Sequence, residues 1–320
     1  TIIQFISKIL STILGLVAIA IITRYLGRDG YGEYTTIITF LSFFGIIADM
    51  GLTLITVQLI SKPNADEKNI LSNLLALRLV SAILFLGIAP LTVIFFPYSN
   101  EVKLGVSVTT LAYLCIALNQ ILVGLFQKNL RMDKVSIAEV ASRIFLVIGI
   151  IVVYKLDYGL MGIMYATIIS SVISFLLHFG FSRSIQKISL KFDFDYWKIV
   201  VSKSWPLALT ITLNLIYLKT DTLILSVLKP VGDVGIYGAA YKVIDVLITI
   251  PFMFAGIILP ILTKKWAEKN TADFKNILQR SFDLMVIFAI PLAFGTQLIA
   301  KDVMVLVAGQ EFAEAGPVLQ

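Results

Sequence analysis

The feature that most constrains this chain is a succession of apolar stretches, each as long as a membrane crossing and each bounded by charges, glycines or prolines. A transmembrane helix needs about 20 mostly apolar residues. Nine stretches of this kind are found, at residues 3–23, 34–60, 71–96, 104–126, 136–154, 159–181, 205–228, 234–262 and 277–299. Charged residues make up 14% of the chain, whereas soluble domains average about 25%. The sequence therefore predicts an all-α, polytopic membrane helix bundle.

Several classes of chemistry are excluded by composition and motifs. A single cysteine, Cys115, and a single histidine, His178, leave no material for a disulfide framework or a Cys/His metal site. A phosphate-binding loop of the Gly-x-x-x-x-Gly-Lys-Ser/Thr type is absent from the sequence. The Asp193-Phe194-Asp195 triplet has the Asp-x-Asp form of some glycosyltransferases, but no nucleotide-binding domain surrounds it. We expect no catalytic residues, no metal and no cofactor, and hence not an enzyme.

Orientation follows from the distribution of Lys and Arg between the two sides of the membrane. The loops after segments two, four, six and eight hold fifteen basic residues, and the loops on the other side hold six. The sequence therefore predicts a cytoplasmic N-terminus in a cell membrane. The net charge of +6 is then a topology signal that also attracts anionic lipid, and it gives no reason to expect nucleic acid as a partner.

The longest hydrophilic stretch divides the chain into two parts. It alternates basic and apolar residues and predicts an amphipathic linker, 183–204, lying on the cytoplasmic leaflet. Six helices precede it in an N-lobe, 1–182, and segments seven to nine with the start of a tenth form a C-lobe, 205–320. Six helices return the chain to its starting side, so a second six-helix unit would have the same orientation as the first, which is a parallel repeat. The C-lobe holds fewer than six segments, so we expect it to be incomplete and both ends of the chain to be trimmed. A Gly-x-Tyr sequence recurs after segments one and seven, at Gly32 and Tyr34 and at Gly235 and Tyr237.

Ionisable side chains within the apolar segments are candidates for function, because each costs at least about 2.5–3.5 kcal/mol at the bilayer centre. Polar residues follow one face of segments one, two, seven and eight at helical spacing, which predicts a hydrated cavity between the two lobes. The predicted cavity residues are Lys8, Asp49, Arg78, Arg143 and Lys242, and the predicted ion-coupling residues are Asp49, Asp221 and Asp245.

Structural roles compete with these assignments. Arg143 lies four residues after Glu139, the favourable order for an intrahelical pair, and Arg78 and Arg143 are within snorkelling reach of a helix end. Lys242 and Asp245, three residues apart, can neutralise each other. Asp49 is in the middle of its segment with no same-helix partner, which makes it the strongest single candidate.

Several of these residues stand in a pattern that resembles a known family. Ser7-Lys8-Ile9-Leu10, the turn from Arg24 to Tyr34, Asp49-Met50-Gly51-Leu52, and Asp221 leading to Val234-Gly235-Ile236-Tyr237 resemble the polysaccharide flippases of the multidrug/oligosaccharidyl-lipid/polysaccharide exporter superfamily. The resemblance implies twelve to fourteen helices in two lobes. It also implies that Lys8 first, with Arg78 and Lys242, engages a pyrophosphate.

The implied function is transfer of a polyprenyl-pyrophosphate-linked oligosaccharide from the cytoplasmic to the outer leaflet by alternating access. The implied partners are this lipid-linked oligosaccharide, membrane lipid, and polysaccharide polymerase and ligase proteins. Two alternatives stay open: a small-molecule cation antiporter of the same superfamily, and a membrane-embedded glycosyltransferase or polymerase. Five basic against four acidic intramembrane residues argue against a cavity built for cationic drugs.

Overall fold

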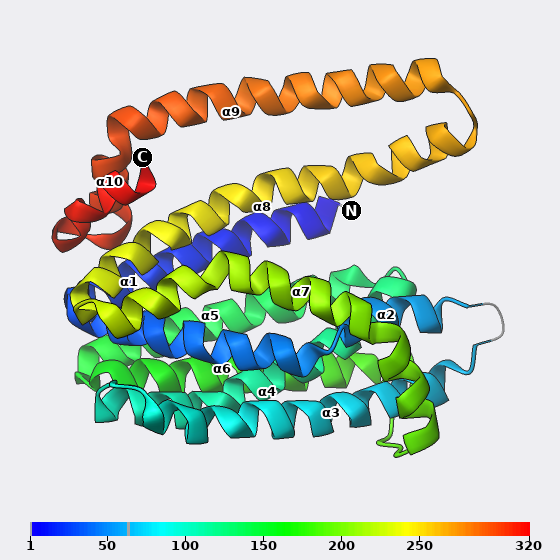
Figure 1. Ribbon diagram of the computed structural model, residues 1–320, viewed down its shortest axis with the longest axis horizontal. Coiled ribbons are helices and arrows are strands. Elements are labelled where there is room, and N and C mark those ends of the chain that lie inside the picture. Colours follow the sequence, from blue (N-terminus) through cyan, green and yellow to red (C-terminus); the bar gives the residue numbers. More distant parts are fainter. Residues whose placement is uncertain (1, 63–64) are drawn as a thin grey trace. The chain divides into compact units, whose positions relative to one another are not determined.

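The computed structural model describes residues 2–62 and 65–320, and the described residues contain helices and connections without a strand. The helices are α1 (Ile2–Asp49), α2 (Leu52–Ile60), α3 (Glu67–Thr92), α4 (Asn100–Lys128), α5 (Met132–Leu156), α6 (Gly159–Ser182), α7 (Phe194–Leu228), α8 (Val231–Ala267), α9 (Thr271–Ala308) and α10 (Gly316–Leu319), with 3₁₀ turns η1 (Val93–Phe95) and η2 (Gln310–Ala315) (Figure 1). The predicted all-α class is confirmed.

The first two predicted segments lie in one long element, α1, which is interrupted at Gly27. This residue has φ 65° and ψ −171°, a conformation open to glycine because it has no Cβ atom. Figure 1 shows the chain reversing direction in this region, so that the arms 2–26 and 28–49 run back along each other. α1 is therefore a helical hairpin whose turn is made by glycine.

Seven helices among the described residues are long and apolar enough to cross a membrane, and the bent α7 makes an eighth. One of the seven runs over Ile6–Ile60, a stretch of 55 residues. That is more than twice the length of about 20 residues that one crossing needs, and the reversal at Gly27 divides it. Each of the nine predicted segments is thus largely helical, with ends that differ from those predicted, and the second is interrupted at Met50 and Gly51.

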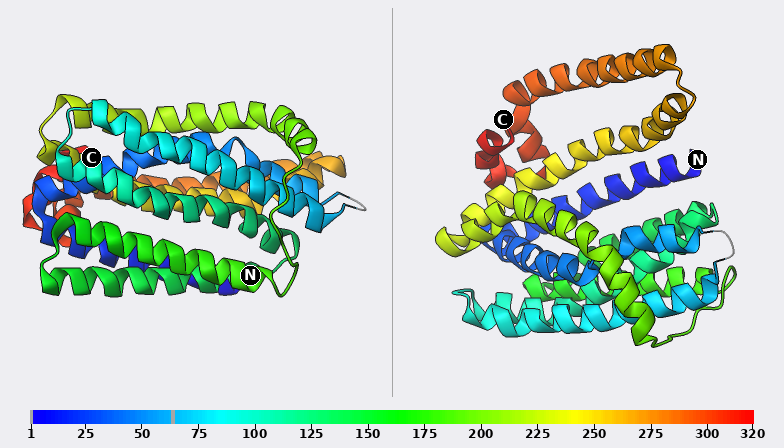
Figure 2. Two further views of the ribbon diagram at one scale, coloured as in Figure 1. Left: turned by 90° about the horizontal axis from the view of Figure 1, so that it is seen from below. Right: turned by 45° about the vertical axis from the view of Figure 1, so that its right-hand side comes forward.

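The chain forms two compact units, Thr1–Gly235 and Ile236–Gln320. In the first unit, α4 packs against α3 and α6, and α5 lies beside α6 and α1 (Figure 2). The outer face of α3 exposes Ile83, Leu84 and Leu91, as expected for side chains that face lipid. The first unit includes α7, so the boundary between the compact units differs from the boundary between the predicted lobes, 1–182 and 205–320. The two lobes stay a prediction.

The connection between α6 and α7 is packed against protein. Residues 194–204 are the first turns of α7, and residues 183–193 run along the start of α3. The amide of Ser189 donates to Ser72 Oγ at 3.3 Å, and the amide of Asp193 donates to Asn73 Oδ1 at 3.1 Å. Trp197 is buried in a cluster with residues of α2, α3 and α4. The predicted amphipathic linker thus uses part of its apolar side against α3, while Leu190, Phe192, Phe194 and Ile199 stay exposed.

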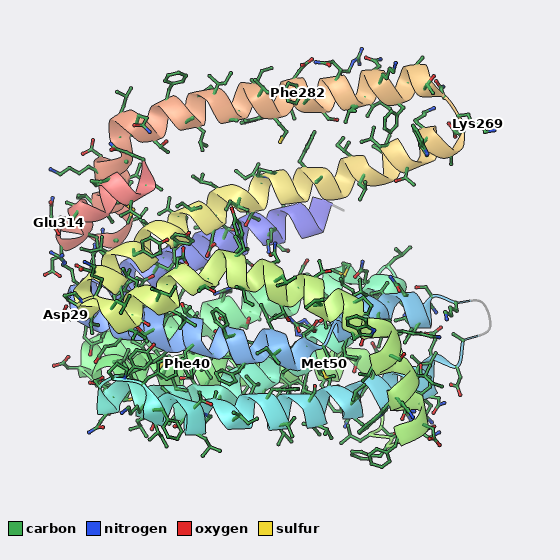
Figure 3. All side chains as sticks on the ribbon, in the orientation of Figure 1. Asp29, Phe40, Met50, Lys269, Phe282 and Glu314 are labelled. Carbon is green, nitrogen blue, oxygen red and sulfur yellow. The ribbon has the colours of Figure 1, made fainter. Side chains whose placement is uncertain are left out.

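The second unit contains most of α8, then α9, η2 and α10. α9 continues through Lys301 to Ala308, so the helix extends beyond residue 299, where the ninth predicted segment ends. The chain then folds back on α9, where Gln297 and Gln320 exchange side-chain to carbonyl hydrogen bonds of 2.8 and 3.0 Å. Many apolar side chains of α9 are exposed, including Phe282 (Figure 3).

Candidate functional site

The best-defined charged site in the described part of the chain is a buried ion pair between Asp49 at the end of α1 and Arg78 on α3. The Nη1 atom of Arg78 lies 2.7 Å from Oδ1 of Asp49, and the two side chains are 1% and 9% exposed. A buried charge is tolerated when it is paired and hydrogen-bonded. The sequence had predicted Asp49 to be without a partner on its own helix, and the partner comes from another helix.

Arg78 also bonds to several uncharged groups. Its Nε donates to the carbonyl of Ala117 at 3.0 Å, its Nη1 donates to the carbonyl of Ala48 at 3.0 Å, and its Nη2 donates to Oε1 of Gln120. With the bond to Asp49, the guanidinium uses four of its five N–H groups. Arg78 therefore joins α1, α3 and α4 and has little donor capacity left for a ligand in this arrangement.

The pair occupies the break between α1 and α2. Met50 and Gly51 have positive φ angles of 49° and 72°, so the carbonyls at the end of α1 lack their regular helical partners. The carbonyl of Ala48 accepts from Arg78 and also from Ser81 Oγ at 2.9 Å. The guanidinium of Arg78 thus bonds both to the carboxylate of Asp49 and to a carbonyl at the end of α1, which explains why a charged side chain is stable here.

Sequence reasoning missed two members of this site, Ser81 and Gln120, and placed a third, Thr53, only on the polar face of segment two. The hydroxyl of Thr53 donates to Asp49 Oδ1 at 2.5 Å, and its Oγ1 also lies 3.2 Å from Gln120 Oε1. Thr53 stood in the predicted polar stripe, but Gln120 is on α4, far away in the sequence. Only the position of Gln120 in the middle of an apolar segment could have marked this residue as a candidate.

The polar stripe of segment two is largely satisfied inside the first unit. Thr39 and Thr56 are buried, and Ser42 Oγ lies 3.0 Å from the hydroxyl of Tyr113 on α4. These groups pack between helices instead of lining open space, which corrects the expectation that the stripe as a set faces a hydrated cavity.

The remaining predicted cations differ in their surroundings. Lys8 on α1 and Arg143 on α5 are both exposed. Among the described residues, no ion pair within 4.0 Å joins Arg143 to Glu139. Lys242 lies 3.9 Å from Asp245 on the same helix, and both side chains are more than a third exposed. Such exposed pairs stabilise little.

The predicted coupling residue Asp221 lies on α7. Its Oδ1 accepts the amide of Thr222 at 2.6 Å. Asp221 belongs to the first unit, and Lys242 and Asp245 belong to the second. A shared cavity containing Asp49 and Lys242 therefore stays a prediction.

Two further groups singled out in the sequence have structural partners. Asp193 is the N-cap of α7, where its Oδ1 accepts the amide of Tyr196 at 3.0 Å. His178 is buried on α6, and its Nδ1 lies 2.8 Å from the carbonyl of Ser174. The described residues contain no group of three His, Cys, Asp or Glu side chains that could hold a metal.

The two recurring Gly-x-Tyr sequences meet each other, the first in α1 after the reversal at Gly27 and the other at the start of α8. A Cβ atom added to Gly32 would overlap the carbonyl of Val231, and one added to Gly235 would overlap the carbonyl of Arg28 and lie 3.1 Å from the amide of Gly32. The backbones of these two sequences can approach this closely only because both positions are glycine. Corresponding positions of the predicted repeat are thus in mutual contact.

Comparison with solved structures shows a shared fold. The chain is similar to the lipid II flippase MurJ in its inward closed conformation, with a TM-score of 0.76, 18% identity, and coverage of 100% of this chain and 71% of that one. It is also similar to the inward-facing conformation of a multidrug resistance MATE family transporter of the MOP superfamily. That match has a TM-score of 0.71, 16% identity, and coverage of 99% and 78%.

Comparison with curated sequences finds a relative in Haloferax volcanii, the probable low-salt glycan biosynthesis flippase Agl15. The two are 23% identical over an alignment 327 positions long, gaps included, which covers 98% of this chain. The chain spans 66% of the length of that relative. The polysaccharide biosynthesis protein family matches residues 1–266, which include every helix from α1 to α7 and nearly all of α8. The chain belongs to the polysaccharide biosynthesis protein family.

Proposed function

We propose that this protein is a transporter that flips a polyprenyl-pyrophosphate-linked oligosaccharide from the cytoplasmic to the outer leaflet of the cell membrane. The observation that carries the proposal is the family match over residues 1–266. The relative Agl15, named a probable glycan biosynthesis flippase, supports the same assignment. Polysaccharide polymerase and ligase proteins are the proposed partners, because they would use the flipped lipid.

The energetics of the step fit a cation-bearing transporter. A headgroup with about two negative charges moves outward with the help of an inside-negative potential, which contributes about 2.3 kcal/mol per charge per 100 mV. The remaining obstacle is the dehydration of phosphate and sugar. Lysine and arginine side chains near the path lower this cost by direct pairing.

We assign substrate contact to Lys8, Arg143 and Lys242, and a positioning role to Arg78 and Asp49. The first three keep exposed or half-exposed charges, whereas the guanidinium of Arg78 is occupied by Asp49, Gln120 and two carbonyls. Asp49, Asp221 and Asp245 remain the proposed sites of any ion coupling. Proton binding by Asp49 would remove its ion pair with Arg78, which gives a physical route from ion to helix packing.

The proposed mechanism is rocking of two lobes related by a parallel repeat, with the N-terminus in the cytoplasm. The contact between the sequences at Gly32 and Gly235 supports a repeat axis that passes between them. A close backbone contact at one end of the helices leaves the other end free to separate. On the predicted orientation, this contact is on the outer side.

The decisive experiment detects lipid-linked oligosaccharide separately in each leaflet after depletion of the protein. We expect the oligosaccharide to accumulate on the cytoplasmic side and to disappear from the outer side. Unchanged leaflet distribution would contradict the proposal. Export of organic cations by the purified, reconstituted protein, without any effect on the oligosaccharide, would favour the antiporter alternative.

A further inference from the structure

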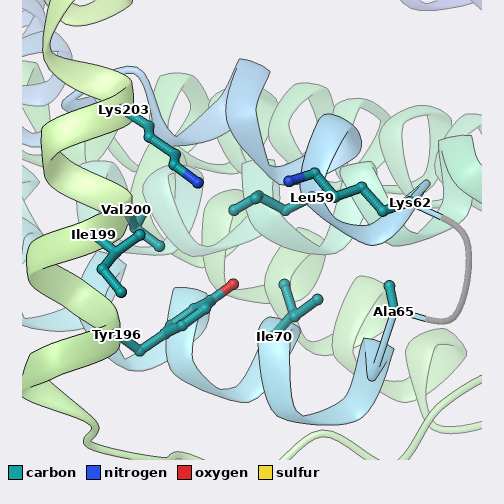
Figure 4. A pocket seen from close by; sticks show the side chains of 8 residues that line it. All are labelled: Leu59, Lys62, Ala65, Ile70, Tyr196, Ile199, Val200 and Lys203. Carbon is teal, nitrogen blue, oxygen red and sulfur yellow. The ribbon is translucent and has the colours of Figure 1, made fainter.

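A pocket of about 270 Å³ lies where the turn after α2 meets the start of α3 and the first turns of α7. Two lysines enter it from different elements: Lys62 follows α2, and Lys203 is on α7. Figure 4 shows their amino groups pointing toward each other across the pocket, with the hydroxyl of Tyr196 directed into the same space. The pocket therefore brings two cations and a hydroxyl together from segments more than a hundred residues apart.

Three acidic side chains near these elements are engaged elsewhere. Asp66 caps α3 by accepting the amide of Asn69 at 3.1 Å, Glu67 pairs with Lys128, and Asp193 caps α7. Within residues 2–62 and 65–320, neither Lys62 nor Lys203 forms an ion pair. Two ammonium groups that face each other without an acidic partner repel one another, and an anion between them removes that repulsion.

The other walls of the pocket are apolar. Leu59 and Val200 are buried beneath it, and Ile70 lines it from α3. A site for a free, fully hydrated phosphate would have polar groups on every side. Cations above an apolar floor, at the ends of helices that cross a membrane, match a phosphate group attached to an acyl or prenyl chain.

We propose that this pocket binds the phosphate headgroup of an anionic membrane lipid. Lys62 and Lys203 contact the phosphate oxygens, Tyr196 donates a hydrogen bond to them, and the apolar wall receives the first carbons of the lipid. This site does not depend on the proposed transport function, since it requires only that the chain is embedded in a membrane. A bound lipid would join Lys62, just after α2, to Lys203 on α7 and so hold the α6–α7 connection in place.

The test measures binding of a fluorescent phosphatidic acid to the purified full chain in neutral detergent, by fluorescence anisotropy. The variant Lys62→Gln/Lys203→Gln should weaken binding about tenfold or more, since hydrogen bonds to charged groups contribute this much when they are lost. The variant Lys62→Arg/Lys203→Arg should keep most of the affinity. Elution in size-exclusion chromatography identifies any variant that has lost its fold.

The matched control is Lys187→Gln/Lys198→Gln, which removes two exposed lysines of the same region that do not line the pocket. This control should bind the probe like the parent protein. Equal weakening in both double variants would overturn the proposal, because it would show a diffuse charge effect. Equal binding by the parent and Lys62→Gln/Lys203→Gln would overturn it as well.

Competition separates the sources of phosphate. Unlabelled phosphatidylglycerol should displace the probe, while inorganic phosphate at the same concentration should not. Displacement by inorganic phosphate as strong as by the lipid would contradict the lipid assignment.

Discussion

Arg78 on α3 is held 2.7 Å from Asp49 at the end of α1, in a site from which water is almost excluded. The two residues stand in different predicted segments, and each alone would be a costly charge in an apolar helix. Together they close the break between α1 and α2 and tie it to α3 and α4. The energetic coupling of this pair can be measured by substitution of one or both partners.

Removal of one partner should cost more than removal of both. Asp49→Asn and Arg78→Gln should each lower the free energy of unfolding by about 3–5 kcal/mol, because each leaves a buried charge without its partner. The double variant should be less destabilised than the sum of the two single variants. Unfolding of the purified protein by sodium dodecyl sulfate measures all three.

The control for this cycle is the exposed pair of Arg131 and Asp133, whose atoms lie 3.1 Å apart. The same substitutions there should change stability little, because water screens exposed pairs. Additive effects of Asp49→Asn and Arg78→Gln would show that the buried pair has no energetic coupling.

We expect Asp49→Asn to insert into the membrane normally but to transport poorly.

We expect polymer export to depend on the positive charge of Lys8. Lys8→Ala should abolish polymer export in cells, while Lys8→Arg should keep much of it, because a compact anionic group is recognised mainly by charge. Polymer is measured at the cell surface, and the amount of protein in the membrane by immunoblot. Lys155→Ala, at an exposed lysine of α5, is the control, and normal export by Lys8→Ala would remove Lys8 from the site.

The two glycines in contact, Gly32 and Gly235, should not tolerate a side chain. Gly32→Ala and Gly235→Ala should each destabilise the protein by about 1–3 kcal/mol, because the added methyl group overlaps backbone atoms that cannot move independently. Gly180→Ala is the matched control on α6, where a Cβ atom meets nothing within 4 Å. That control should be neutral or stabilising, since alanine favours helix over glycine by about 1 kcal/mol. The midpoint of thermal unfolding in detergent distinguishes these outcomes.

Cysteine labelling tests the orientation. An impermeant thiol reagent added outside intact cells should modify Asp29→Cys and should leave Leu190→Cys unmodified until the cells are opened. Both positions are exposed, whereas the neighbouring Tyr31 is fully buried and unsuitable. The native Cys115 is buried, so the parent chain should stay unlabelled. The reverse labelling pattern would overturn the proposed cytoplasmic N-terminus.

Asp193 distinguishes a transporter from a glycosyltransferase. Asp193→Asn should keep polymer production near the level of the parent, because asparagine caps a helix as well as aspartate does. Asp193→Ala should lower stability without a specific loss of activity. Complete loss of polymer by Asp193→Asn at normal protein levels would instead support the catalytic alternative.

Several properties of the chain could be predicted from local sequence. Stretches of about 20 apolar residues cannot be placed in water, and in lipid they must satisfy their backbone groups as helices. This reasoning predicted the all-α class and placed each segment within helical structure. The recurrence of Gly32 and Gly235 was also visible, because it is a short local pattern, but the contact between the two glycines was not.

Pairing across helices was not visible in the sequence. The helical period places Asp49 and Thr53 on one face, but nothing local shows that Arg78 and Gln120 arrive from α3 and α4 to meet them. The same holds for Lys62 and Lys203, and for the docking of Trp197, which made the predicted interfacial linker part of a protein core. Apolar stretches of membrane-spanning length are enough to predict a helical membrane protein with a few ionisable side chains inside its apolar segments. Tertiary structure decided which charges are consumed by a partner and which stay available to a ligand, because that depends on contacts between residues far apart in the chain.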